Sequence, residues 1–310
     1  MSKEKNFISA VVYAGEDKKC LKSFLRFLDR SLSKKFEKYE IICAVDGNIN
    51  THKKAIDSFA EKCHCPSVSV VSLSFFHGLE LAMKAGTDLS IGDFVLEFDN
   101  CTADYDASII MDCYKECLKG NDIVSVSPLS PKRHSSKLFY KVFNTFSSIQ
   151  SKLTSESFRI LSRRAINRVG ATNPNLVYRK AAYACSGLKT STIFYTPTTT
   201  EQPHYSKKVR SSRKAIAINS LILFTNVGFR FSSFISVAML LITLSILIYT
   251  IVVFLVGNPI TGWTTMMLLS SFSFFGLFSL SAIIIKYLDL LLDLSFKKKE
   301  YLIENIEKKK

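Results

Sequence analysis

The longest stretch without a charged side chain, residues 231–285, constrains the fold of this chain more than any other feature. It runs for 55 consecutive residues without Asp, Glu, Lys or Arg. Two Gly, one Pro and one Asn within residues 257–263 predict a turn that divides it. Each side is long enough to cross a bilayer, which takes about 20 residues of helix. We therefore predict two transmembrane helices, at about 235–256 and 265–285.

Flanking charges predict the orientation of these two helices. Arg230 precedes the first, Lys286 and the run 297–299 follow the second, and the turn between them has no Lys or Arg. The positive-inside rule then places both termini in the cytoplasm, in a two-span protein of the inner (cytoplasmic) membrane. The absence of a secretory signal pattern at the N-terminus agrees with that placement. A buried helical hairpin in a large soluble core is the alternative, but soluble helices rarely run 20 residues without a charge.

The net charge of +15 comes from one block of the sequence. Residues 1–131 carry 16 basic and 19 acidic residues, whereas residues 132–230 carry 18 basic and 2 acidic residues. A basic block directly before an apolar stretch indicates an anionic membrane surface or a phosphate-bearing lipid as the partner. The apolar stretch that follows disfavours nucleic acid.

The N-terminal half alternates between apolar runs and segments with helical spacing. This alternation predicts a mostly parallel sheet with helices on both faces. The expected strands are 7–13, 40–45, 68–73, 94–98 and 123–126, and the expected helices are 20–32, 53–63, 78–87 and 108–119. The charged tail from residue 297 onward is expected to be a short helix or a frayed end.

Two aspartates follow expected strands and should lie at the same edge of the sheet. Asp46 ends the second strand and Asp99 follows the fourth. In parallel sheets, ligands bind beyond the carboxyl ends of the strands. A carboxylate there can accept from a ribose or a base, and two can hold a divalent cation beside a diphosphate. Alternatively, each aspartate only caps the turn or helix that follows it.

The order of these segments resembles the membrane-anchored family 2 glycosyltransferases of the GT-A fold, the group of dolichyl-phosphate mannose synthases and bacterial polyprenyl-phosphate glycosyltransferases. Residues 71–99 follow the family pattern without a gap, including Gly78, Glu80 and Asp99. Residues 136–140 and 158–165 also match, as does a two-span tail with Gly-Trp before the second span. The resemblance covers nearly the whole chain.

The resemblance implies a domain organisation and a reaction. It divides the chain into a GT-A-like domain (1–195), a basic loop with a juxtamembrane amphipathic helix (196–230), the two spans (231–290) and a charged cytoplasmic tail (291–310). The implied reaction is inverting transfer of a sugar from a nucleotide sugar to a polyprenyl phosphate, in cell-surface glycan synthesis. Relatives of this type also imply a homo-oligomer, namely a tetramer.

The resemblance also assigns residues to roles. Asp99 and Asp104 are the expected catalytic residues, and Asp99 is the expected ligand of Mg²⁺ or Mn²⁺. The nucleotide sugar is expected at Gly15, Glu16, Asp46 and Asp99. The acceptor phosphate is expected at cations of the basic block, because arginine suits bidentate phosphate contacts: Lys132, Arg133, Arg159, Arg163 and Arg164.

Several departures from the family pattern fall on polar positions. The usual Asp-x-Asp is Asp99-Asn100-Cys101, the usual Asp before Phe-Arg is Ser157, and the usual Arg-Asn before the third helix is Phe75-Phe76. Cysteine is a poor ligand for Mg²⁺ and Mn²⁺, which prefer oxygen. A catalytically degenerate relative that binds lipid phosphate, or that partners an active glycosyltransferase, is therefore the alternative function.

Overall fold

The computed structural model describes most of the first 224 residues and a short segment near the C-terminus. The described residues are 3–15, 18–47, 49–129, 134–146, 153–172, 178–198, 207–224 and 303–308, with scattered positions between 234 and 291. The chain divides into two units, one formed by residues 1–220 with 299–310 and the other by residues 221–298.

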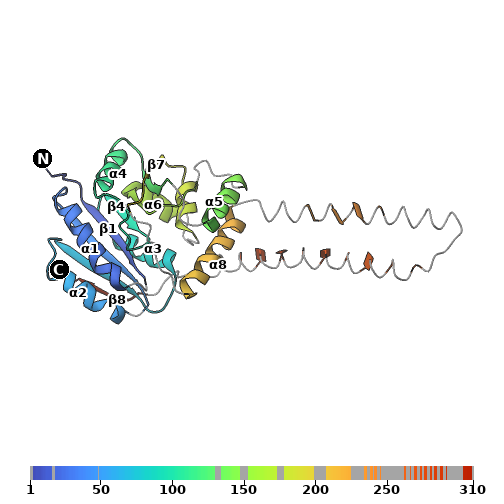
Figure 1. The fold of residues 1–310 in the computed structure, drawn as a ribbon, viewed down its shortest axis with the longest axis horizontal. Coiled ribbons are helices and arrows are strands. Elements are labelled where there is room, and N and C mark those ends of the chain that lie inside the picture. The colour runs from blue at the N-terminus through green and yellow to red at the C-terminus, as the bar shows by residue number, and fades with distance from the viewer. Residues whose placement is uncertain are drawn as a thin grey trace. The chain divides into compact units, whose positions relative to one another are not determined.

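The first unit contains a mixed eight-stranded sheet with the order β7-β5-β6-β4-β1-β2-β3-β8 (Figure 1). Its strands are β1 (Ile8–Ala14), β2 (Tyr39–Asp46), β3 (Ser67–Leu73), β4 (Phe94–Phe98), β5 (Ile123–Pro128), β6 (Phe158–Ser162), β7 (Thr190–Tyr195) and β8 (Ile303–Lys308). Four neighbouring strands, β4, β1, β2 and β3, are parallel to one another. β6 runs antiparallel to both of its neighbours, β4 and β5.

Helices cover both faces of the sheet, because successive strand residues point to opposite faces. On one face, Ala10 and Val12 of β1 pack with α1, α2 and α4, whereas Val11 faces α3 on the other. The helices of the unit are α1 (Lys18–Ser33), α2 (Lys53–Ala60), α3 (Leu79–Leu89), α4 (Ser108–Leu118), α5 (His134–Phe146), α6 (Arg163–Thr172), α7 (Arg179–Cys185) and α8 (Lys207–Phe224), with a 3₁₀ turn at Ile49–Thr51. The α/β class and every strand and helix predicted for residues 7–126 are confirmed, with small shifts at the ends.

The C-terminal segment departs from the expectation of a helix or frayed end. Residues 303–308 form β8, antiparallel to β3, with Ile306 opposite Val71. An apolar strand such as β3 would otherwise expose its backbone donors and acceptors at the edge of the sheet. Pairing with β8 satisfies the backbone donors and acceptors along that edge of β3. The prediction of a helix or a frayed end is therefore wrong for residues 303–308, which form a strand.

The second unit contains the two predicted transmembrane helices, but the structure describes only scattered residues of it. Most of 235–256 and 265–285 lies outside the described residues, and within the described ones no helix is long and apolar enough to cross a bilayer. The helix expected within residues 196–230 is α8, which begins at Lys207 and ends at Phe224.

Candidate functional site

A buried cluster of opposite charges lies at the carboxyl end of β4. The antiparallel register of β4 and β6 places Glu97 directly opposite Arg159. The Arg159 guanidinium donates from Nη1 to Glu97 Oε2 at 3.1 Å and from Nη2 to Asp99 Oδ2 at 3.2 Å. One arginine from β6 therefore holds two carboxylates of β4, across two neighbouring strands.

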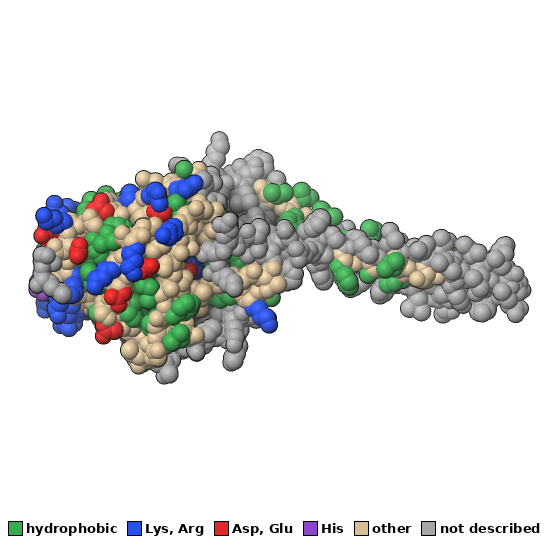
Figure 2. Space-filling model, turned by 90° about the horizontal axis from the view of Figure 1, so that it is seen from above, with side chains coloured by type: hydrophobic (Ala, Val, Ile, Leu, Met, Phe, Trp, Pro, Cys, Tyr) green, Lys and Arg blue, Asp and Glu red, His purple; other side chains and the backbone are tan. Residues whose placement is uncertain are grey.

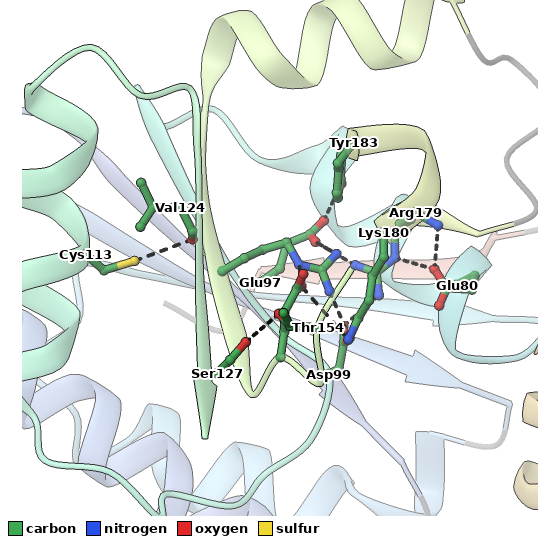
Figure 3. Close-up of polar contacts among 12 residues, drawn as sticks. Glu80, Glu97, Asp99, Cys113, Val124, Ser127, Thr154, Arg179, Lys180 and Tyr183 are labelled. Atoms are coloured by element: carbon green, nitrogen blue, oxygen red, sulfur yellow. Dashed lines mark hydrogen bonds and ion pairs between the residues drawn. The ribbon is translucent and has the colours of Figure 1, made fainter. Parts of the chain in front are cut away.

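A second arginine approaches the same carboxylates from the start of α7. Arg179 Nη2 donates to Asp99 Oδ1 at 2.6 Å, and its Nη1 lies 2.8 Å from Glu97 Oε2. Its Nε also donates to Glu80 Oε2, in the first turn of α3, at 2.9 Å. Figure 3 shows Arg179 and Lys180 facing Glu80, Glu97 and Asp99. The arginine thereby joins α7, α3 and β4.

Further polar groups complete the cluster. Glu156 Oε2 lies 2.9 Å from Arg159 Nε and 3.9 Å from Lys180 Nζ. Glu97 Oε1 accepts hydrogen bonds from Tyr183 Oη at 2.8 Å and from the Thr87 hydroxyl at 3.0 Å. Four carboxylates thus face three cations, and the side chains of both arginines are no more than 2% exposed. Buried charges persist only when they are paired in this way.

The arginines determine the ionisation of Asp99. Burial alone would raise the pKa of its carboxyl, but Arg179 and then Arg159 outweigh burial and hold that pKa well below its usual range. Conversely, burial would lower the pKa of Arg159, but Glu156, Asp99 and Glu97 raise it. Asp99 is therefore an ionised carboxylate near neutral pH, and both of its oxygens bond to guanidinium groups.

The contacts of Asp99 bear on whether its carboxylate can bind a divalent metal ion. Mg²⁺ and Mn²⁺ need several oxygen ligands, and both Asp99 oxygens already accept from arginines. The next candidate position is Cys101, whose thiol donates to the Tyr13 carbonyl at 3.5 Å. Among the described residues, no three or more His, Cys, Asp or Glu side chains are grouped so that they could hold a metal ion. The residues around Asp99 do not fit a divalent cation in this arrangement, and its role as a ligand stays a prediction.

Asp104 belongs to a separate hydrogen-bonded chain. Its Oδ1 accepts from Tyr195 Oη at 2.9 Å, and the same hydroxyl lies 2.6 Å from Ser157 Oγ. Asp104 is 1% exposed. The structure does not show Asp104 bonded to Asp99, so a shared catalytic role of these two residues stays a prediction.

Asp46 is held by the backbone of a turn. Its carboxylate accepts from the N–H of His77 at 2.7 Å and of Gly78 at 2.8 Å, and from Tyr13 Oη at 3.2 Å. Burial raises the pKa of Asp46, and these three donors offset only part of that rise. Gly15 lies against the Tyr13 ring, since a Cβ there would be 2.8 Å from Tyr13 Cε1. Asp46 therefore holds the turn before α3, 31 residues further along the chain, and not the turn that follows β2. Nucleotide contact at Asp46 stays a prediction.

The remaining predicted cations do not converge on this edge of the sheet. Arg163 follows β6 and donates to the Gly92 carbonyl, at the amino end of β4. Arg164 pairs with Asp122, just before β5. Both arginines therefore lie at the opposite edge from Asp99. Three further predicted residues lie outside the described residues: Glu16, Lys132 and Arg133.

The basic block is therefore not only a surface feature. Arg159, Arg179 and Lys180 all come from it, and the two arginines are buried against carboxylates that come mostly from the acidic half. Figure 2 shows that the described surface in that view carries Lys and Arg side chains interspersed with Asp and Glu.

Sequence reasoning missed several members of the cluster. Arg159 was assigned to the acceptor phosphate, whereas four partners went unassigned: Glu97, Glu156, Arg179 and Lys180. The available signal was local, since Glu97 and Arg159 are the only charges in the apolar strands 94–98 and 158–162. A charge in a buried strand demands a partner.

Comparisons with known proteins support a transferase-like fold. No protein-family model matches the chain. An uncharacterised glycosyltransferase of Synechocystis, sll0501, is 27% identical over 164 residues, and the match spans about half of each protein (51% of this chain and 50% of the relative). The mannosyltransferase PcManGT of Pyrobaculum calidifontis, solved in complex with GDP-Man and Mn²⁺, matches with a TM-score of 0.53 at 13% identity, covering 96% of this chain and 89% of that one. The likeness shows a GT-A-like fold. That neighbour binds Mn²⁺ and a nucleotide sugar, the same kinds of ligand that the sequence resemblance implies.

Proposed function

We propose that the protein is a glycosyltransferase that moves a sugar from a nucleotide sugar to a polyprenyl phosphate. The observation that carries the proposal is the carboxyl edge of the sheet. There, Asp46 and Asp99 follow parallel strands of a fold similar to that of a nucleotide-sugar transferase. The relative sll0501, which carries the name glycosyltransferase, supports the reaction class. The basic block and the uncharged stretch 231–285 support a membrane-bound acceptor.

The donor is proposed to bind on the Asp46 side of this edge. Asp46 orders the turn from His77 to Gly78, and Tyr13 and Gly15 adjoin it. Asp99, by contrast, is 6% exposed and bonded to two arginines. In this arrangement Asp99 acts indirectly, by fixing α7 and β6 beside the site.

The acceptor needs positioning more than activation. A phosphate monoester is ionised near neutral pH, so it can attack without a strong general base. One phosphate oxygen forms a bond to the anomeric carbon while the bond from that carbon to the donor diphosphate breaks. The nucleoside diphosphate leaves with the electron pair, and the configuration inverts. A contact between this phosphate and Arg159 requires that one of the carboxylates around Arg159 gives way, because Glu97, Asp99 and Glu156 surround it.

The test is turnover by the full-length protein in detergent. Polyprenyl phosphate and a panel of nucleotide sugars should yield nucleoside diphosphate and a lipid-linked sugar in equal amounts. Asp46→Asn tests the donor side of the edge, and Asp112→Asn on the exposed side of α4 is its matched control for loss of a carboxylate. Failure of every sugar in a broad panel, with no stabilisation of the protein by any nucleoside diphosphate, would remove the enzyme proposal.

A non-catalytic binder is the second candidate. It is favoured by the two guanidinium groups on Asp99 and by Cys101 at the usual second aspartate. Such a protein would bind polyprenyl phosphate, or an active glycosyltransferase, without releasing nucleoside diphosphate. Binding of polyprenyl phosphate vesicles without turnover would identify it.

A further inference from the structure

An exposed pair of stacked rings lies in the loop between β3 and α3. The Phe75 side chain is 56% exposed. Its ring stacks on the His77 imidazole, with ring centres 4.0 Å apart and planes 21° apart. His77 Nδ1 also lies 2.6 Å from the Phe75 carbonyl oxygen, so the bond requires the proton on Nδ1. His77 thus covers one face of the Phe75 ring.

The backbone that carries these rings is held firmly. The N–H groups of His77 and Gly78 both donate to Asp46, at 2.7 and 2.8 Å. Gly78 has φ +96°, and a Cβ there would lie 3.0 Å from Ser212 Oγ of α8. A turn whose backbone is held by a carboxylate, with a helix beside it, presents its rings at little cost in conformational entropy.

We propose that the outer face of Phe75 is the stacking surface for the base of a nucleoside diphosphate. The inference rests on the proposed function and names the residue that holds the donor's base. Every nucleobase has a flat face that stacks on an aromatic ring, and Phe75 is already stacked on its other side. The rings lie at the carboxyl edge of the sheet, where ligands of such folds bind.

The helix that adjoins the turn carries cations in its sequence. Ser212 touches the turn, and the next two residues of α8 are Arg213 and Lys214. Cations on a helix that adjoins the turn favour an anionic ligand over a neutral aromatic one. An isolated exposed phenylalanine without these neighbours would carry no such meaning, because single exposed apolar residues are common.

The test replaces the Phe75 ring with a fluorescent indole that reports on stacking. Trp263 is the one tryptophan of the chain, so Phe75→Trp on a Trp263→Phe background gives a single indole at the stack. Titration of the full-length protein in detergent with UDP or GDP should quench its fluorescence to saturation, and pyrophosphate, which has no base, should not. Calorimetry should show Phe75→Ala binding the same nucleotides about tenfold more weakly, and Phe75→Tyr binding them nearly as the wild type does.

Phe194→Ala is the matched control, because Phe194 is 55% exposed but lies on β7. It should leave nucleotide affinity unchanged. If the wild type binds nucleotides and Phe75→Ala binds them equally, or if they leave the reporter fluorescence unchanged, the stacking inference fails and the proposed function stands. If the wild type binds no nucleoside diphosphate, both fail.

Discussion

Two aspartates end parallel strands of one sheet, yet their surroundings are opposite. Asp99 lies among buried side-chain cations, which keep its pKa well below the usual range. Asp46 lies at a partly exposed turn among backbone N–H groups, and burial raises its pKa. The same position at the edge of a sheet therefore produces a structural ion cluster at one strand and an accessible, ordered turn at the other.

The contrast between the two aspartates indicates where a ligand can enter. A carboxylate with both oxygens bonded to buried arginines stabilises the protein and offers little to solvent. A carboxylate that fixes a turn presents the neighbouring side chains, here Phe75 and His77. We therefore propose that the donor binds on the Asp46 side and that the Asp99 side serves stability.

The largest expected effect comes from removing Arg179. Arg179→Met leaves Glu80, Glu97 and Asp99 with too few cations, and breaking a buried pair costs about 3–5 kcal/mol. Urea unfolding of the full-length protein in detergent measures the loss. Arg164→Met, at a side chain that is 69% exposed, should change the unfolding free energy little. Equal effects of the two variants would contradict the buried cluster.

The pH dependence of stability should differ in sign between the two aspartates. The folded-state pKa of Asp99 lies below its unfolded value, so its stabilisation is complete above about pH 4 and is lost as the pH falls towards the folded value. The folded-state pKa of Asp46 lies above its unfolded value, so its protonation favours the folded state as the pH falls.

Unfolding free energies from pH 7 to pH 3 test this difference. The advantage of the wild type over Asp99→Asn should shrink as the pH falls, and its advantage over Asp46→Asn should grow. Parallel curves for the two variants would show that the two sites are electrostatically alike.

Asp46→Asn should also lower the free energy of unfolding by about 1–2 kcal/mol at pH 7. One of the backbone N–H donors of the turn then faces an amide NH₂, which cannot accept its hydrogen bond. Nucleotide affinity should fall together with stability, since the turn positions Phe75. Amide exchange at His77 and Gly78 measures the turn itself. Unchanged protection of both amides would separate Asp46 from the turn.

The smallest effect is expected at Gly15. Gly15→Ala places a Cβ against the Tyr13 ring and displaces the Tyr13 hydroxyl from Asp46. The free energy of unfolding should fall by about 0.5–1.5 kcal/mol. Tyr13→Phe removes the same hydrogen bond without displacing the ring, so thermal unfolding should rank the two variants close together. A much larger loss in Gly15→Ala would indicate that the backbone, and not the hydroxyl, is affected.

The sequence predicted the part of the fold that local periodicity controls. Strand 94–98 and the shared edge of Asp46 and Asp99 followed from apolar runs and strand ends, and the structure confirms both. It could not predict that Arg179 reaches Asp99, because that contact joins residues 80 positions apart through the placement of α7. The tail strand β8 was missed for the same reason, since only its pairing with β3 makes a charged segment extended.

The basic block shows the limit of composition. Its excess charge was assigned to the membrane surface and the acceptor, but Arg159 neutralises carboxylates inside the sheet domain. Charge counts alone do not distinguish a buried cation from a solvated one. The apolar strand around Arg159 was the better guide.

The central claim is sugar transfer from a nucleotide donor bound on the Asp46 side. The most direct measurement follows labelled sugar from nucleotide sugars into polyprenyl phosphate, with the full-length wild type beside Asp46→Asn and Phe75→Ala. We expect a lipid-linked product from the wild type, and from both variants a higher KM for the nucleotide sugar with little change for the lipid. Transfer by both variants with unchanged donor KM, or no transfer by the wild type with any sugar, would contradict the account.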